Sequence, residues 1–115
     1  MKREFLDYIE DIIEAMNNAI NFTQNIEYDD FLKDDKTIYA VVRALEIIGE
    51  AVKNLPDEIK QQYSQIPWRN IIGMRDKLIH EYFGVNKEIV WDTIKNELPK
   101  LKPLFEEITE DYKEF

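Results

Sequence analysis

The sequence predicts an all-α fold, a compact antiparallel up-and-down bundle of four to five helices. Apolar residues recur at three- and four-residue intervals along most of the chain, which is the period of an amphipathic helix. The 115 residues include only 3 glycines and 4 prolines, and no stretch alternates long enough for a strand. With 44% hydrophobic and 34% charged residues, the chain is expected to form one globular domain over residues 1–115.

The first half of the chain predicts two long helices joined by an acidic connection over residues 21–35, which contains a short helical turn. Each helix has one apolar stripe. The stripes comprise Phe5, Ile9, Ile12, Ile13, Met16 and Ile20 in the first helix, and Ile38, Val41, Val42, Leu45, Ile48, Val52 and Leu55 in the second. Gly49 lies inside the second helix and costs about 1 kcal/mol relative to alanine. We therefore expect a neighbouring helix to approach it closely, within the fold or across a subunit interface.

The second half predicts a short helix after Pro56 and two longer ones. The first longer helix begins at Pro67, and Gly84 is placed to end it as a left-handed cap. Asn86 is placed to cap the last helix. The apolar stripe of that helix keeps its period through Pro99, which predicts a kink and not two separate helices. The stripe comprises Val90, Ile94, Leu98, Leu101, Phe105, Ile108 and Tyr112.

The composition of the chain limits the compartment and the kinds of site that can be expected. The chain has no cysteine, which excludes disulfides and thiolate metal sites and favours a reducing compartment. No run approaches the roughly 20 apolar residues of a membrane span, and no signal-type apolar block follows the charged start. We therefore expect a cytoplasmic protein that does not enter membranes. The acidic run at residues 29–35 lacks the ligand spacing of a calcium loop and is expected to be solvated surface.

The net charge of −9 argues against a simple nucleic-acid binder, because the whole molecule should repel phosphate. The charge is unevenly distributed. Residues 68–87 contain four cations and two acids, whereas the acidic excess lies in residues 27–35 and after residue 106. This distribution predicts a locally basic patch on an acidic body, or else a basic partner. The charges of the patch are Arg69, Arg75, Lys77 and Lys87 against Asp76 and Glu81.

The stretch from Arg75 to Tyr82 contains the only histidine of the chain, His80. An arginine that cannot lose its proton, near a side chain that titrates close to neutral pH, suits chemistry on a phosphodiester. On one continuous helix Arg75 and Tyr82 would lie about 20° apart, and Asp76 and His80 about 40° apart. Arg75 and His80 would diverge by about 140°. Either the arginine reaches across the helix, or two copies build the site jointly about a two-fold axis.

The pattern Arg75-x4-His80-x-Tyr82 resembles the motif of the HEPN superfamily, and specifically of the HepT-like toxins. Further blocks resemble that family in the same order and extend the likeness over nearly the whole chain. They are residues 43–51 (RALEIIGEA), residues 66–74 (IPWRNIIGM), and residues 91–94 (WDTI) with 98–99 (LP).

The resemblance implies a metal-independent endoribonuclease that acts as a homodimer on an RNA substrate and needs no cofactor. In that family the 2′-hydroxyl of RNA attacks the adjacent phosphate and leaves a 2′,3′-cyclic phosphate. Carried over, His80 would be the general base or acid, and Arg75 would stabilise the developing charge. Relatives often have asparagine after the arginine. Here Asp76 could orient the imidazole, but it also places a negative charge near the phosphate.

The resemblance also implies a type II toxin–antitoxin pair. HepT-like toxins are silenced by a minimal nucleotidyltransferase antitoxin, which transfers AMP from ATP to a tyrosine of the toxin. The resemblance implies that this tyrosine is Tyr82 here. An adenylate beside the catalytic pair would block RNA by bulk and by negative charge.

Less specific interpretations exist for each residue. Tyr82 could belong to the core, Arg75 could form a salt bridge with Asp76 or Glu46, and Arg43 could pair with Glu46 on a solvated face or line an RNA groove. Trp68 and Trp91 are expected to be packing residues. The main alternative function is a non-catalytic helical subunit that binds a nucleotidyltransferase and helps to present nucleotide or substrate. A dimerisation module without a ligand is disfavoured by the intact arginine–histidine pair.

Overall fold

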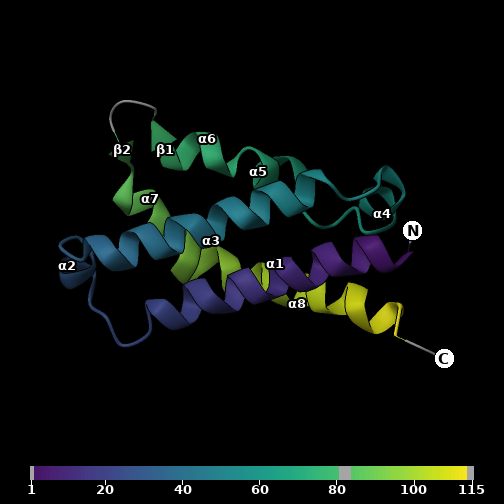
Figure 1. The fold of residues 1–115 in the computed structure, drawn as a ribbon, viewed down its shortest axis with the longest axis horizontal. Coiled ribbons are helices and arrows are strands. Elements are labelled where there is room, and N and C mark those ends of the chain that lie inside the picture. The colour runs from purple at the N-terminus through teal and green to yellow at the C-terminus, as the bar shows by residue number, and fades with distance from the viewer. Residues whose placement is uncertain (1, 81–83, 114–115) are drawn as a thin grey trace.

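The computed structural model describes residues 2–80 and 84–113, without the side chains of residues 2, 3, 75 and 78–80. Four helical runs alternate in direction along the molecule, which confirms the predicted all-α up-and-down bundle (Figure 1). The runs are α1 (Lys2–Phe22), α3 (Asp35–Lys53), α5 (Trp68–Ile72) followed by α6 (Met74–Leu78), and α7 (Lys87–Asp92) followed by the π-helix η1 (Thr93–Glu97) and α8 (Leu98–Asp111). Shorter elements connect them: α2 (Tyr28–Phe31), α4 (Asp57–Gln62), β1 (Ile79–His80) and β2 (Gly84–Val85).

The core forms where the apolar stripes of α1, α3 and the η1–α8 run meet. Most of the predicted stripe residues are buried, including Ile9, Ile48 and Phe105, which are 0% exposed. Ile13 and Ile20, at the edge of the first stripe, are partly buried against the core. Burial of each large side chain contributes about 1.5–3 kcal/mol, so the periodic positions together supply the main stabilising term.

Polar side chains define the beginnings of two helices. Asp34 accepts hydrogen bonds from the backbone N–H of Thr37 at 3.1 Å and from its hydroxyl at 2.6 Å, which caps α3. These two donors, the hydroxyl first, lower the pKa of the Asp34 carboxyl. Asn86 accepts a hydrogen bond from the N–H of Ile89 at 3.1 Å and caps α7, as predicted.

Gly49 faces α5 within the same chain. A Cβ built on Gly49 would lie 3.8 Å from the carbonyl oxygen of Ile71. This is an ordinary van der Waals distance, and it identifies the neighbouring helix that the glycine predicted. The neighbour lies within the fold, but this distance would also admit an alanine, so the α3–α5 contact does not by itself require glycine at position 49.

The connection between α1 and α3 is fastened by two lysines from the far end of the sequence. Lys87 donates from Nζ to the carbonyl of Leu32 at 3.0 Å, and Lys95 donates to the carbonyl of Thr23 at 2.9 Å. The Lys95 ammonium also lies 4.7 Å from the ring centroid of Trp91, a cation–π geometry. These contacts hold the acidic connection against α7 and η1.

Both tryptophans pack as predicted. Trp91 lies against the rings of Tyr28 and Phe31, with centroid separations of 5.5 and 4.9 Å. Trp68 meets Phe105 edge to face at 5.6 Å, and its indole N–H donates to the carbonyl of Lys60 at 2.9 Å. Both rings are partly buried against the core, which is the position of a packing residue.

The prediction of one helix from Pro67 to Gly84 is wrong. Gly73 separates α5 from α6, and α6 ends at Leu78. Residues 79–80 instead pair antiparallel with residues 84–85, with Ile79 opposite Val85 and His80 opposite Gly84. Gly84 has the expected positive φ, +81°, but it lies in this two-stranded sheet and does not cap a helix. Ile79 is β-branched and favours extended backbone, which is consistent with the helix ending at Leu78.

The last helical run is continuous from Lys87 to Asp111, but a sequence reading could not place its irregular turn. Residues 93–97 form a π-helix directly before Pro99, which lies in the first turn of α8. Proline cannot donate a hydrogen bond to the preceding turn, and a wider turn is one way for a helix to pass such a residue. The run therefore passes Pro99 without dividing into two separate helices.

Candidate functional site

The backbone brings the predicted motif to one side of α3. Arg75 and Asp76 lie on α6, which packs against α3, and His80 lies on β1 directly after α6. The side chains of Arg75 and His80, and the whole of Tyr82, fall outside the described residues. Asp76 is exposed. The structure thus places the chain positions of Arg75, Asp76 and His80 on consecutive elements at the end of the third helical run.

The angles predicted between the motif residues no longer apply, because they assumed one helix through Tyr82. The helix ends at Leu78, so His80 is not stacked one turn from Asp76. A strand advances about 3.3 Å per residue and alternates its side chains, whereas a helix advances 1.5 Å. The 140° divergence of Arg75 and His80 was one argument for a site shared between two copies, and Gly49 was the other. The observed fold removes the first argument and leaves the second untested, because the α3–α5 contact would admit an alanine as well.

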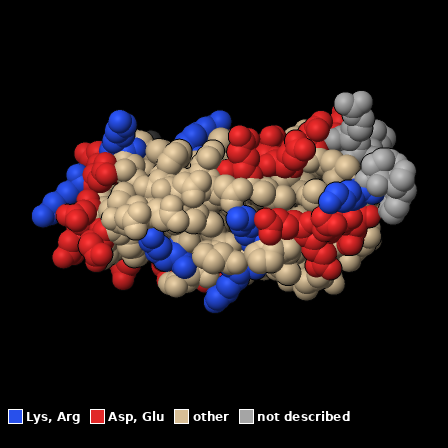
Figure 2. Space-filling view, turned by 90° about the horizontal axis from the view of Figure 1, so that it is seen from below, with Lys and Arg blue, Asp and Glu red and all other residues tan. Residues whose placement is uncertain are grey.

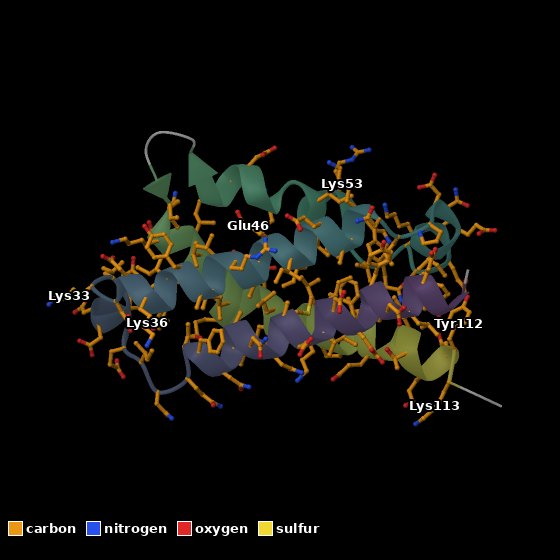
Figure 3. All side chains as sticks on the ribbon, viewed as in Figure 1. Lys33, Lys36, Glu46, Lys53, Tyr112 and Lys113 are labelled. Carbon is orange, nitrogen blue, oxygen red and sulfur yellow. The ribbon has the colours of Figure 1, made fainter. Side chains whose placement is uncertain are left out.

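The part of α3 beneath α6 contains a cluster of charged residues. Arg43 lies 3.6 Å from a carboxylate oxygen of Glu46 and 3.8 Å from one of Glu50. The Arg43 side chain is 61% exposed and that of Glu46 is 23% exposed. Figure 3 shows Glu46 in the middle of α3, on the stretch that α6 overlies. The predicted pairing of Arg43 with Glu46 is confirmed, and its exposure means that it contributes little to stability.

The predicted basic patch is smaller than the sequence suggested. Arg69 and Lys77 are exposed, but the ammonium of Lys87 is engaged by the carbonyl of Leu32. Asp76 is exposed beside Lys77 and offsets part of its charge. Among the described side chains of this stretch, Arg69 and Lys77 therefore remain as the cations that face solvent.

The side of the molecule turned away from this segment is acidic. Figure 2 shows it, with acidic side chains at one end and across the opposite half of the viewed face, and a broad area of uncharged residues between them. Of the acidic connection, Asp29, Asp30 and Asp35 are exposed as predicted, and Asp34 caps α3. None of the helices in the described part of the chain has the length and apolarity to cross a membrane. A polyanion would approach such a molecule where exposed cations are not surrounded by carboxylates.

A groove of about 320 Å³ borders α6 on the side of the last helical run. Asn70, Met74 and Lys77 form part of one wall, and Ile89 and Glu97 form part of the other. Sequence reasoning assigned no role to Asn70 or Glu97. The two residues come from separate segments with no shared spacing, so nothing in the sequence pattern could have joined them.

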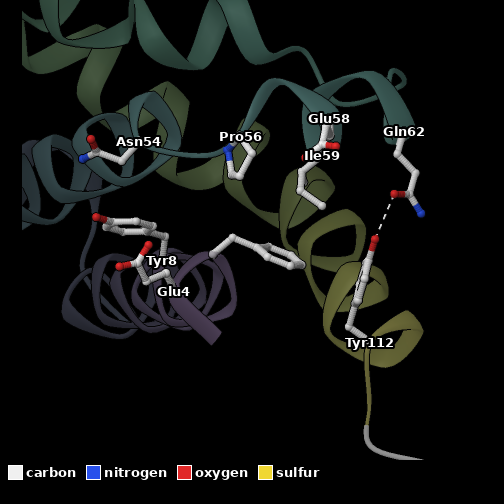
Figure 4. Close-up of a pocket in the computed structure, with 9 residues that line it drawn as sticks. Glu4, Tyr8, Asn54, Pro56, Glu58, Ile59, Gln62 and Tyr112 are labelled. Carbon is white, nitrogen blue, oxygen red and sulfur yellow. Dashed lines mark hydrogen bonds between the residues drawn. The ribbon is translucent and has the colours of Figure 1, made fainter. Parts of the chain in front are cut away.

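Another pocket of about 320 Å³ lies at the opposite end of the molecule, between α1, α4 and α8. Its lining includes Glu4, Tyr8 and Tyr112, and the Tyr112 hydroxyl donates to Gln62 at 2.9 Å across the rim (Figure 4). Figure 1 shows α4 and both termini at this end, far from the β1–β2 pair. This pocket is therefore separate from the segment that contains Arg75 and His80.

Comparison with known proteins assigns the fold and the motif to a family. The family model described as Ribonuclease HepT-like matches residues 8–108, which include all of the motif. The chain belongs to the HepT-like ribonuclease family. The resemblance inferred from the sequence blocks is thereby confirmed.

Three HepT-like relatives cover nearly the whole chain. A protein of Thermococcus cleftensis named "Probable ribonuclease HepT" is 53% identical over 108 residues, which is 94% of this chain and 98% of the relative. A "Putative RNase" of Methanocaldococcus jannaschii is 50% identical over 110 residues, covering 96% and 91%. A "Putative RNase" of Caldanaerobacter subterraneus is 50% identical over 106 residues, covering 92% and 95%. No solved structure matches the chain significantly.

Proposed function

We propose that this HepT-like protein is a metal-independent endoribonuclease and the toxin of a type II toxin–antitoxin pair. The observation that carries the proposal is the intact Arg75-x4-His80-x-Tyr82 motif in a chain that shares about half of its residues with proteins named as ribonucleases. A non-catalytic binding subunit would have no chemical need for both Arg75 and His80. The exposed cations Arg69 and Lys77 support the approach of RNA to the same segment.

In the proposed reaction the 2′-oxygen of a ribose attacks the adjacent phosphorus. The bond from phosphorus to the 5′-oxygen of the next nucleotide breaks, and a 2′,3′-cyclic phosphate forms. His80 takes the proton of the 2′-hydroxyl or gives one to the departing 5′-oxygen, a role that contributes about 10²–10⁴-fold to rate. Arg75 stabilises the extra negative charge on the phosphorane with its fixed cation. Asp76 is the supporting residue of the proposed site, as the exposed carboxylate that follows Arg75 on α6.

We further propose that Tyr82 is the point of control by a minimal nucleotidyltransferase antitoxin. The phenolic oxygen attacks the α-phosphate of ATP, pyrophosphate leaves, and the phenolic proton is lost to base. The AMP group then adds bulk and a negative charge two residues from His80, which repels RNA. Incubation with antitoxin and ATP should add the mass of AMP groups to the wild type but not to Tyr82→Phe. Silencing by the antitoxin without modification of Tyr82 would contradict this assignment.

The proposed homodimer rests on the family resemblance and on Gly49, since the angle between Arg75 and His80 no longer supports it. Sedimentation at micromolar concentration tests it directly. A monomer that cleaves RNA at full rate would show that one copy holds a complete site.

Cleavage of a defined RNA by purified protein in EDTA tests the ribonuclease itself. We expect wild type to leave cyclic phosphate ends and Arg75→Ala and His80→Ala to lose cleavage. Lys113→Ala is the matched control, because Lys113 is an exposed cation at the end of the molecule away from the hairpin (Figure 3). A folded, unmodified wild type that cuts no RNA would favour the nucleotidyltransferase-binding subunit.

The single histidine makes a second, sharper test possible. An NMR titration follows one imidazole, so its pKa is assigned without mutagenesis. If His80 is the general base or acid, the pKa of the imidazole should match one limb of the pH–rate profile. A pH–rate profile with no limb at the pKa of the imidazole would contradict the assignment of His80 as general base or acid.

A further inference from the structure

The groove beside α6 combines an apolar floor with polar residues along its walls. Its floor is apolar and buried, with Ile71 3% exposed and both Met74 and Leu101 9% exposed. Ile89 is 38% exposed and offers an aliphatic surface at the opening. The volume of about 320 Å³ is at the lower end of the range for small-molecule sites. Such a groove can take one unstacked nucleobase between apolar side chains.

The groove and the motif share one helix. Met74 and Lys77 line the groove, and Arg75 lies between them on α6. The chain then runs directly from α6 into β1, which carries His80. A base held in the groove therefore belongs to a nucleotide close to the bond that Arg75 and His80 are proposed to act on.

The polar groups of the groove favour one kind of base. The carboxylate of Glu97 only accepts hydrogen bonds, and its two oxygens suit two adjacent N–H donors. Guanine presents such a pair on its Watson–Crick edge, at N1 and at the 2-amino group. Adenine and cytosine present a single amino group beside an acceptor nitrogen, and uracil presents one N–H between two carbonyls. In each of these three bases an acceptor atom would lie against an oxygen of the Glu97 carboxylate, and two acceptors cannot form a hydrogen bond.

The opposite wall completes the recognition. Lys77 is exposed on α6 and supplies a cation for an RNA phosphate, while the Asn70 amide can donate or accept at the rim. On the same wall as Glu97, the hydroxyl of Thr93 already donates to the carbonyl of Ile89 at 2.8 Å, so it retains only acceptor capacity toward a ligand. The groove thus combines a cation for a phosphate, Lys77, with hydrogen-bonding groups for the edge of a base.

We propose that this groove is a guanine subsite, in which Glu97 reads the N1 and 2-amino edge of a base next to the cleaved phosphodiester. The inference rests on the proposed ribonuclease function and adds a substrate preference to it. Glu97 and Asn70 are then specificity-determining residues, and Lys77 contributes affinity that does not depend on sequence.

The test uses two sets of four short RNAs, in which every 2′-hydroxyl but one is methylated and the RNAs of a set differ only in the base beside the single cleavable ribose. Each base is placed in turn on the 5′ and the 3′ side of that ribose. Wild type should cleave the guanine substrate about tenfold faster than the other three, which is the discrimination typical of one bidentate contact. Glu97→Gln should lose this preference, so that the ratio of the guanine rate to each of the other three falls from about tenfold to within about twofold.

Control variants separate reading of the base from general binding. Glu107→Gln removes an exposed carboxylate of α8 that does not line the groove, and it should keep the guanine preference. Lys77→Met should weaken all four substrates alike and lower the salt dependence of binding. Equal cleavage of all four RNAs by wild type, or a guanine preference that survives Glu97→Gln, would overturn the subsite.

A binding arm keeps this inference distinct from the ribonuclease proposal. Fully 2′-O-methylated versions of the same oligonucleotides cannot be cut, and their affinities can be measured by fluorescence anisotropy. Tighter binding of the guanine oligonucleotide that Glu97→Gln abolishes would support the groove even for a protein that cuts nothing. Cleavage without any guanine dependence in rate or binding would leave the ribonuclease intact and the subsite refuted.

Discussion

Replacement of Gly49 by alanine should stabilise the protein. The residue lies in the interior of α3, where alanine is favoured over glycine by about 0.8–1.0 kcal/mol. The new Cβ would lie 3.8 Å from the carbonyl oxygen of Ile71, so the methyl group enters ordinary contact and nothing has to move. We therefore expect the free energy of unfolding to rise by about 1 kcal/mol and the melting temperature by roughly 3–6 °C for a chain of this size.

Urea unfolding followed by circular dichroism measures this change directly, with an unchanged m-value as the sign that only stability has altered. Gly84→Ala is the informative contrast. Gly84 has φ +81° with nothing within 4 Å of a built Cβ, so alanine there meets backbone strain without a packing clash. That strain should cost about 1–2 kcal/mol.

A loss of stability in Gly49→Ala would refute the reasoning. It would mean that the space beside Gly49 is narrower in solution than the fold provides, as it would be if a second copy packed against α3. Sedimentation of the same variant distinguishes the two cases. A fall in dimer affinity would restore Gly49 as an interface residue, whereas an unchanged assembly would locate the error in the α3–α5 contact.

Three further predictions concern single interactions. Burial and then the hydrogen bond to Asp111 raise the pKa of Tyr63, so the stability that this phenol contributes is complete below about pH 10 and falls as the pH rises further. Tyr63→Phe should therefore flatten the alkaline decline in urea midpoints and lower the free energy of unfolding near neutral pH by about 1 kcal/mol. The lowered pKa of Asp34 gives stability that is present above about pH 4 and lost on acidification, so Asp34→Asn should flatten the acid limb while keeping the cap, and Asp34→Ala should lower the midpoint throughout. Lys95→Met should cost about 1–2 kcal/mol in urea unfolding, because it removes the hydrogen bond that closes the end of α1 together with the contact over an indole ring.

The helices and the core were predictable because each long helix repeats its apolar residues over several turns. Periodicity of this kind is a local signal, and tertiary packing confirmed it at Ile9, Ile48 and Phe105. The cap at Asn86 was predictable for the same reason, since a cap and its target lie three residues apart. Gly49 also predicted a neighbouring helix, although the sequence could not say which helix it would be.

The hairpin could not be read from the sequence, because Leu78 and Ile79 continue the helical stripe up to the point where the helix ends. A strand of two residues is too short to show alternation, and Gly84 suits a helix cap as well as a turn in a sheet. The groove was hidden for another reason, since Asn70 and Glu97 meet only through tertiary packing. The roles of Arg75, His80 and Tyr82 stay predictions that the proposed experiments address.

The two lysine contacts that hold the connection between α1 and α3 can form only late in the synthesis of the chain. Lys87 and Lys95 follow the carbonyls that they hold, at Leu32 and Thr23, by 55 and 72 residues. Because synthesis proceeds from the N-terminus, α1 and α3 leave the ribosome long before either lysine exists. A nascent chain that stops before residue 87 lacks both ties and the helical run that covers α1. The order of translation therefore keeps the molecule incomplete until its last quarter emerges, and the final helix closes the fold in one late step.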